Sequence, residues 1–320
     1  MRAVAAPASL KGVLSPLEAA ALLAVGLRRV DGLDVDELPV ADGGEGTAAV
    51  LHASLGGAWH TATVADALGR QVEARWLSLD DGGAVVESAA AVGLPLIAPD
   101  ERDPLAASSR GFGELLAAVL AQEPASVLVC VGGTATVDGG AGMREVLEAW
   151  PRGVPLQVAC DVRNPLLGAR GAARAFGPQK GADASAVEEL ERRLATLEEL
   201  VPYRDLPGAG AGGGLGAALA ALGGKLRSGA ELVLDLVRFD DRARYADLVI
   251  TGEGTVDATT FEGKAPGAVV RRCEALDVRC ELFGGLVAAD FDAHRLSGQV
   301  DLAAADLVRL GERLGATLRS

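Results

Sequence analysis

The stretch RAVAAPASLKGVLSPLEAAALLAVGLRRVDGLDVDELPVADGG (residues 2–44) decides the fold class of this chain. Its apolar start at residues 2–6 predicts a short buried strand. The tetrapeptide Ser15-Pro16-Leu17-Glu18 predicts the start of a helix, because serine is a typical N-cap, proline suits the first helical position and glutamate completes a capping box. A second strand is predicted at residues 35–40. Strand, helix and strand in this order are typical of a parallel sheet covered by helices.

The same pattern returns near the C-terminus. The segment ADLVIT (246–251) predicts a strand, a helix follows from Lys264 to Leu276, CELFGGLV (280–287) predicts another strand, and a last helix begins at about residue 304. We therefore predict a doubly wound α/β domain that is split in sequence, with residues 1–58 and 238–320 as its two parts.

The region between these two parts follows a different pattern. Residues 60–90 give three short segments with strand character, separated by the turn-forming stretches ADALGR and DDGG. Further apolar segments at 126–131, PLQVACD and ELVLDLV continue this region. An antiparallel meander inside an α/β chain indicates a second domain. We predict an inserted α/β domain with antiparallel strands at residues 59–237.

The composition excludes several classes of partner. The 320 residues are 49% apolar and carry a net charge of -14, which disfavours nucleic acid and anionic membrane as main partners. No apolar run has the length of a membrane span, and the four cysteines lack paired metal spacing, so we expect a cytoplasmic protein with reduced thiols. Three scattered histidines argue against a zinc site or a histidine-based triad.

Lysine is rare in this chain and always lies beside glycine. Only 4 of the 30 basic residues are lysines, namely Lys11, Lys180, Lys225 and Lys264. A lysine ammonium is a compact charge on a long flexible stem, which suits a phosphate group that moves during a reaction. We interpret Lys11, Lys180 and Lys264 in this way and take the position of Lys225 as coincidence.

Acidic residues in glycine-rich loops form the second functional pattern. Asp-Gly-Gly-x-Gly occurs at 42–46 and again at 138–142, each time after an apolar run and before a helical pattern. The loop after residues 2–6 carries Lys11, and GEGTVDATTFEGK (252–264) follows the strand ADLVIT. Loops at the carboxyl ends of parallel strands line the ligand crevice of such sheets. Glycines and helix N-termini suit phosphate, and nearby carboxylates suit Mg²⁺. The alternative is that Asp-Gly simply forms turns and caps.

Two common nucleotide-binding motifs are weak or absent. Gly208-x-Gly210-x-x-Gly213 matches a dinucleotide fingerprint in form, but no clear strand precedes it. A Walker A loop is absent, because Gly254 lies too far from Gly263-Lys264.

With these loops in view, the chain closely resembles the bacterial glycerate kinase family, type 1. The resemblance covers nearly the whole length and rests on LPVADGGEGT, GGTATVDGGAGM, ACDVRNPLLGARGAARAFGPQKGA, LPGAGAGGGLGAAL and ITGEGTVDATTFEGKAP, in that order. It implies a flavodoxin-like (Rossmann-like) domain split by an inserted α/β domain. It also implies transfer of the ATP γ-phosphate to D-glycerate with Mg²⁺, with 2-phosphoglycerate as the favoured product. The chain departs from the family pattern at Ala8, Leu10, Val137 and Thr255 and in a shortened segment near 150–154.

The resemblance and the loops together assign candidate roles. Asp42 or Asp138 would accept the proton of the glycerate hydroxyl. Lys264, with Lys11 and Lys180, would hold phosphates or the substrate carboxylate. Glu253 and Asp257 are candidate Mg²⁺ ligands. Glu45, Asp161 and Asn164 are candidate substrate ligands, with a capping role as the alternative for Asp161 and Asn164. The candidate ATP-binding residues are Lys11, Gly43, Gly44, Gly139, Gly140, Lys180, Gly210 and Gly212.

Other functions remain open from sequence alone. A phosphatase or phosphate-ester lyase would need an in-line water or a histidine acid, and no histidine lies in these motifs. A kinase of another small hydroxy acid, or a non-catalytic two-domain protein that binds phosphate or a small acid, stays an alternative. The oligomeric state is also open, with a homo-oligomer as one alternative.

Overall fold

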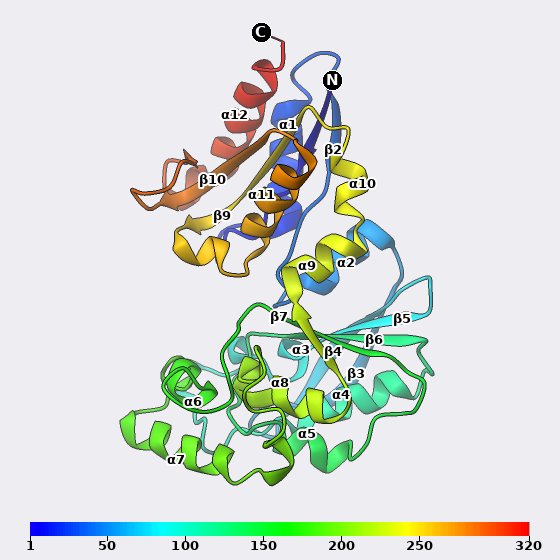
Figure 1. Ribbon diagram of the computed structural model, residues 1–320, viewed down its shortest axis with the longest axis vertical. Coiled ribbons are helices and arrows are strands. Elements are labelled where there is room, and N and C mark those ends of the chain that lie inside the picture. The colour runs from blue at the N-terminus through cyan, green and yellow to red at the C-terminus, as the bar shows by residue number, and fades with distance from the viewer. Residues whose placement is uncertain (320) are drawn as a thin grey trace. The chain divides into compact units, whose positions relative to one another are not determined.

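The computed structural model describes residues 1–319, which form two compact units (Figure 1). The first unit contains residues 1–42 and 49–54 and the chain from Ala230 onward, and the second contains residues 43–48 and 55–229. Each unit has its own sheet and its own hydrophobic core.

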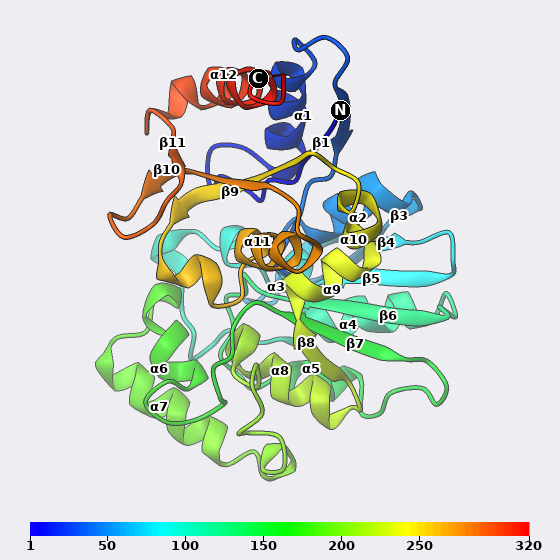
Figure 2. The same cartoon turned by 45° about the horizontal axis from the view of Figure 1, so that its top comes forward.

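The first unit contains a five-stranded parallel sheet with the order β11-β10-β9-β1-β2. Helix α11 covers one face of this sheet, and α1 and α12 cover the other (Figure 2). Its elements are β1 (Arg2–Ala5), α1 (Pro16–Leu27), β2 (Asp34–Glu37), α9 (Gly229–Leu236), α10 (Phe239–Ala243), β9 (Leu248–Val256), α11 (Ala265–Leu276), β10 (Cys280–Val287), β11 (His294–Arg295) and α12 (Ala303–Ala316). Helix α2 (Thr47–Leu55) contains residues of both units.

The start of α1 follows from its sequence. Ser15 accepts a hydrogen bond from the backbone N–H of Glu18, the Glu18 carboxylate accepts from the backbone N–H of Ser15, and Pro16 begins the helix. This is the predicted capping box. Helix α12 packs against α1 through glycines, since a Cβ on Gly311 would lie 2.3 Å from the carbonyl oxygen of Leu23. The two helix backbones therefore approach more closely than any side chain would allow.

The second unit contains a six-stranded mixed sheet with the order β3-β4-β5-β6-β7-β8. The first three strands pair antiparallel as the predicted meander, and β5 to β8 pair in parallel. Its strands are β3 (Ala58–Ala65), β4 (Gln71–Ser78), β5 (Gly83–Glu87), β6 (Ser126–Val131), β7 (Leu156–Cys160) and β8 (Lys225–Ser228). Its helices are α3 (Ala89–Val92), α4 (Arg110–Leu120), α5 (Ala141–Val146), α6 (Ala172–Phe176), α7 (Ala184–Ala195) and α8 (Ala211–Ala221).

The predicted fold class is confirmed by the parallel sheet built from both ends of the chain and by the inserted mixed sheet. The apolar segment ELVLDLV forms most of helix α9, whereas the other apolar segments, at 126–131 and PLQVACD, form strands β6 and β7. A short apolar run fits a buried helix as well as a buried strand, so its type depends on tertiary contacts. The domain limits at residues 58 and 238 remain a prediction of where separately folding domains begin.

We expect Gly311→Ala to destabilise the protein by roughly 1–3 kcal/mol, because the added methyl group has no space between α12 and α1. A loss of stability would be informative, because without a steric clash the replacement of glycine by alanine in a helix would increase stability by about 1 kcal/mol. The measurement is urea unfolding, with Ala305→Val at an exposed position of α12 as the control. A Gly311→Ala protein more stable than wild type would contradict this packing.

Candidate functional site

The first unit has its most favourable ligand position at the carboxyl ends of β1 and β9. Strand β2, which follows β1 in the sequence, pairs with one edge of β1, whereas β9 pairs with the opposite edge of β1. In open parallel sheets, ligands bind outside the carboxyl ends of strands where the strand order reverses in this way.

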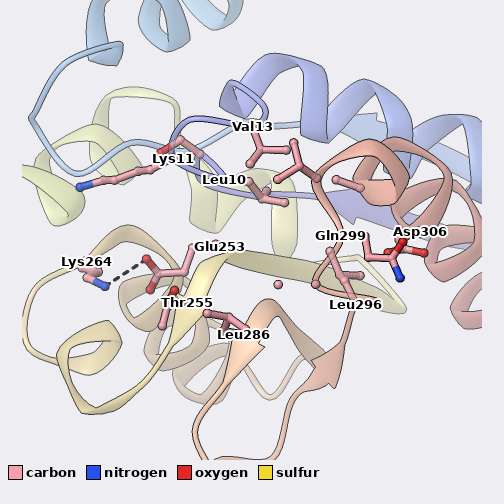
Figure 3. Close-up of a pocket in the computed structure, with 16 residues that line it drawn as sticks. Leu10, Lys11, Val13, Glu253, Thr255, Lys264, Leu286, Leu296, Gln299 and Asp306 are labelled. Atoms are coloured by element: carbon pink, nitrogen blue, oxygen red, sulfur yellow. Dashed lines mark hydrogen bonds and ion pairs between the residues drawn. The ribbon is translucent and has the colours of Figure 1, made fainter. Parts of the chain in front are cut away.

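A cavity of about 370 Å³ lies at this position. Leu10 and Lys11 follow β1, Glu253 and Thr255 lie near the end of β9, and Leu286 belongs to β10 (Figure 3). The lining is completed by Ser9, Val13, Gly254, Lys264, Gly285, Leu296, Gly298, Gln299, Val300, Ala303 and Asp306. The predicted residues Lys11, Glu253 and Lys264 are therefore brought together in one cavity.

Glu253 is held in a fixed position by two partners. Its Oε1 accepts a hydrogen bond from the Thr260 hydroxyl at 2.7 Å, and its Oε2 forms an ion pair with Lys264 Nζ at 3.1 Å (Figure 3). Lys264 is also the N-cap residue of α11, so its backbone lies where that helix begins. The buried carboxylate of Glu253 therefore orients the ammonium group of Lys264 beside the cavity.

Asp257 has a capping role in this loop. Its Oδ1 accepts hydrogen bonds from the backbone N–H and the hydroxyl of Thr259 at the start of a 3₁₀ helix (Ala258–Phe261). These bonds lower the pKa of Asp257, the hydroxyl of Thr259 contributing most. Among residues 1–319, no three His, Cys, Asp or Glu side chains are grouped so that they could hold a metal. Mg²⁺ in kinases needs only one or two carboxylates with phosphate oxygens, so Glu253 and Asp257 fit as a partial ligand set.

In the second unit, Asp138 ties two helices together. Its Oδ2 accepts hydrogen bonds from Ser109 N at 2.8 Å, Ser109 Oγ at 2.7 Å and Gly142 N at 3.2 Å. Its Oδ1 accepts from Gly140 N at 3.1 Å. Ser109 precedes α4, and Gly140 and Gly142 lie at the start of α5. The carboxylate thus satisfies backbone donors that the start of a helix leaves unpaired.

Lys180 lies beneath the same loop. The residue is only 4% exposed, and its Nζ donates to Thr134 Oγ1 at 3.1 Å and to the carbonyl oxygen of Thr136 at 2.7 Å. Burial lowers the pKa of Lys180 to about 7, against the opposing attraction of Asp138. The structure therefore places this lysine as a support of the loop, with no exposed ammonium.

Packing explains most of the predicted glycines. A Cβ on Gly139 would lie 2.4 Å from Leu197, and one on Gly140 would lie 2.4 Å from Ala218. A Cβ on Gly212 would lie 2.6 Å from Val131, and one on Gly210 would lie 2.4 Å from the carbonyl oxygen of Pro165. These positions need glycine for close approach, whatever they bind. Residues Gly212–Gly214 also have a left-handed backbone, so the regular turns of α8 begin after them.

The loop at 43–46 lies over the carboxyl ends of β6 and β7. A Cβ on Gly43 would lie 2.8 Å from that of Ala159, and one on Gly132 would lie 3.1 Å from the Cα of Gly44. Exposed Glu45 lies near Gly133. The glycine segment of the first Asp-Gly-Gly loop therefore lies beside Gly132 and Gly133, which precede the second Asp-Gly-Gly motif.

Asp42 lies in the segment that follows β2, and Asp161 and Asn164 lie in the segment that follows β7. Asp42 is half-buried and is the residue at which the chain leaves the first unit. Asp161 follows β7 directly. Asn164 Nδ2 donates to the carbonyl oxygen of Arg170 at 2.7 Å, which joins the two ends of the loop between these residues.

Glu87 is a residue of this edge that the sequence did not single out. Its Oε1 accepts from the backbone N–H of Ala48 at 2.7 Å, which fixes the end of the 43–48 loop. Burial raises the pKa of Glu87, although its bonds to the N–H groups of Ala48 and Gly46 oppose this. The sequence feature that could have indicated Glu87 is a single acidic residue at the end of an apolar strand.

A model of the glycerate kinase family matches residues 3–150 and 145–308. The chain belongs to the glycerate kinase family. It is 39% identical to a glycerate kinase of Bacillus subtilis, over 92% of this chain and 87% of that protein. It is 40% identical to a glycerate 2-kinase of Escherichia coli, over 83% of this chain and 80% of that protein. These matches confirm the predicted resemblance and the predicted enzyme class, an ATP-dependent kinase.

A solved structure supports the glycerate kinase fold over the whole chain. The crystal structure of a putative glycerate kinase 2 from Salmonella typhimurium superposes with a TM-score of 0.85 and 34% sequence identity, covering 100% of this chain and 98% of that one. The likeness confirms the predicted flavodoxin-like architecture with its inserted domain. No helix among the described residues is both long enough and apolar enough to cross a membrane.

We expect the stability of this protein to rise with pH between about 7 and 10 through Lys180. In the folded protein its pKa is about 7, whereas a lysine in the unfolded chain titrates near ~10.4. The unfolded state then binds more protons in this window, so the free energy of unfolding increases by up to about 1.4 kcal/mol per pH unit from this group. Below pH 7 both states are protonated and the contribution is flat.

The measurement is urea unfolding of wild type and Lys180→Met at several pH values. The methionine variant removes the titrating group, so its free energy of unfolding should rise less steeply above pH 7. Equal slopes for the two proteins would show that Lys180 keeps an ordinary pKa.

Proposed function

We propose that this protein transfers the γ-phosphate of ATP to the 2-hydroxyl of D-glycerate and releases 2-phosphoglycerate and ADP. The observation that carries the proposal is the pair Lys264–Glu253 beside a cavity at the strand-order reversal, in a chain of the glycerate kinase family. The glycerate 2-kinase of Escherichia coli, 40% identical, supports the choice of the 2-hydroxyl.

In this proposal Lys264 and Lys11 stabilise the phosphate groups. Phosphoryl transfer depends mainly on positioning and on charge stabilisation, so two cations beside one cavity are suitable groups. Glu253 holds the ammonium of Lys264 in place through their 3.1 Å ion pair.

Mg²⁺ would be held by Glu253, Asp257 and the phosphate oxygens of ATP, and when bound it would neutralise charge on those phosphates. Asp257 is partly exposed, and its carboxylate is positioned by Thr259. The chain's own contribution is to fix these two carboxylates, one near the end of β9 and the other directly after it.

We assign the general base to Asp42 and a positioning role to Asp138. Four donors converge on Asp138, which favours a carboxylate that orders the loop. Asp42 lies next to Gly43 on the loop that Glu87 fixes at its other end. Glu45, Asp161 and Asn164 remain our proposed substrate ligands. Gly43, Gly44, Gly139, Gly140, Lys180, Gly210 and Gly212 would act by shaping the backbone of the second unit, Lys180 through Thr134 and Thr136. We also propose a cytoplasmic location.

The direct test is incubation of the purified protein with MgATP and D-glycerate, followed by ³¹P and ¹H NMR of the product. We expect 2-phosphoglycerate, with no reaction when Mg²⁺ is chelated. Exclusive formation of 3-phosphoglycerate would contradict the proposed regiochemistry. Faster turnover of another short hydroxy acid would contradict the proposed substrate.

Substitution of Asp42 and of Asp138 should have different effects, the first on turnover and the second on stability. Asp42→Asn should lower kcat by ~10²-fold or more with little change in stability, because it removes a general base. Asp138→Asn should lower the free energy of unfolding by roughly 1–3 kcal/mol, because an amide cannot accept all four hydrogen bonds.

Steady-state kinetics and urea unfolding of both variants check this pair. A normal kcat for Asp42→Asn, together with a ~10²-fold loss for a fully stable Asp138→Asn, would reverse the assignment.

A further inference from the structure

The cavity of the first unit has a charged part and an apolar part. Lys11 and Lys264 lie toward one end, whereas Leu10, Val13 and Leu286 lie away from them and Gln299 lies toward the other end (Figure 3). A ligand that fills this space must carry anionic groups at one end and a weakly polar surface at the other.

The apolar part is open and uncovered. Leu286 and Val300 are each 64% exposed and Val13 is 36% exposed, and all three line the same cavity. Single exposed aliphatic residues are ordinary on protein surfaces, but a group of them around one cavity marks a binding surface.

Part of the wall carries no side chains. Gly254, Gly285 and Gly298 all line the cavity. A Cβ on Gly254 would lie 3.6 Å from the backbone of Leu10 and Lys11, which is ordinary van der Waals contact, so a methyl group fits there without displacing any atom. Backbone surface of this kind lets a flat ring system approach closely.

The polar end of this wall is rigidly held. Asp306 accepts hydrogen bonds from the backbone N–H of Ser297 at 2.9 Å and from its hydroxyl at 2.5 Å, and Ser297 Oγ accepts from the backbone N–H of Gln299. These contacts fix the turn that presents Gln299. A primary amide offers both a donor and an acceptor, which matches the edge of an adenine ring.

Size and polarity distinguish the two substrates of the proposed reaction. Glycerate has three carbon atoms, all bearing oxygen, and gains nothing from aliphatic side chains. A nucleoside has a planar base and a ribose, which suit a mostly apolar cavity of about 370 Å³. Its phosphate chain would extend toward Lys11 and Lys264.

We infer that the surface formed by Leu10, Val13, Gly254, Leu286 and Gln299 is the site for the adenosine part of ATP. This inference rests on the proposed use of ATP by this unit and adds the location and the residues of the nucleoside site. The adenine ring lies against Leu286 and the glycine wall, Gln299 pairs with its edge, and the phosphates reach the two lysines.

The test compares MgADP with magnesium tripolyphosphate, which carries phosphates but no nucleoside, by titration calorimetry on the full chain. Gly254→Ala adds a methyl group to the glycine wall and should weaken ADP binding about tenfold, with tripolyphosphate binding within twofold of wild type. Leu286→Ala should weaken ADP binding about threefold to tenfold. It removes only an exposed side chain, so it tests the site even if Gly254→Ala folds poorly.

Leu206→Ala is the matched control, because Leu206 is 40% exposed and lies outside the cavity, and its ADP affinity should equal that of wild type. Wild-type ADP affinity in both cavity variants would overturn the inference, as would an equal loss for ADP and tripolyphosphate.

The outcomes also separate this inference from the proposed reaction. If the protein does not phosphorylate glycerate but both cavity variants lose ADP selectively, the nucleoside site stands and the proposed substrate is wrong. If the protein phosphorylates glycerate with an unchanged KM for ATP in both variants, the reaction stands and the nucleoside site is wrong.

Discussion

The pairing of β1 with β9 is the constraint on which the first unit depends. It joins Ala3 to Leu248 and Ala5 to Ile250, and Thr251 Oγ1 adds a hydrogen bond to the carbonyl oxygen of Ala6 at 2.7 Å. This pairing closes the whole chain between β1 and β9 into one loop, which costs conformational entropy, although the cost grows only slowly with the length of the loop. All of these strand residues are fully buried, so apolar burial offsets it. The same pairing creates the strand-order reversal at which the cavity lies.

The second unit depends on buried polar contacts around one loop. Lys180 supports the loop from below through Thr134 and Thr136, and Asp138 ties its end to the starts of α4 and α5. An unpaired buried ammonium or carboxylate would be costly, so each contact leaves little freedom in the loop backbone. This explains how a glycine-rich segment keeps a defined shape. It also gives residues with charged side chains an architectural role beside any chemical one.

Sequence patterns predicted the local elements and the set of loops well. The capping box at Ser15, the strand at 126–131 and the helix ending at Leu276 lie where their patterns indicate. Lys11, Glu253 and Lys264 were expected to meet, and they line one cavity. The roles of single charged residues were less predictable. Nothing local distinguishes an exposed lysine beside glycine from Lys180, whose burial depends on residues more than forty positions away.

The sequence by itself determined the elements and the family, because periodicity, caps and motif blocks are local features that survive without tertiary contacts. Only the tertiary structure decided that ELVLDLV forms a helix, that Asp138 is saturated by four donors, and that Leu286 and Gln299 border the cavity. The physical reason is that burial, hydrogen-bond partners and cavity walls come from residues distant in sequence. The chemistry of a side chain depends on those neighbours as much as on its own identity.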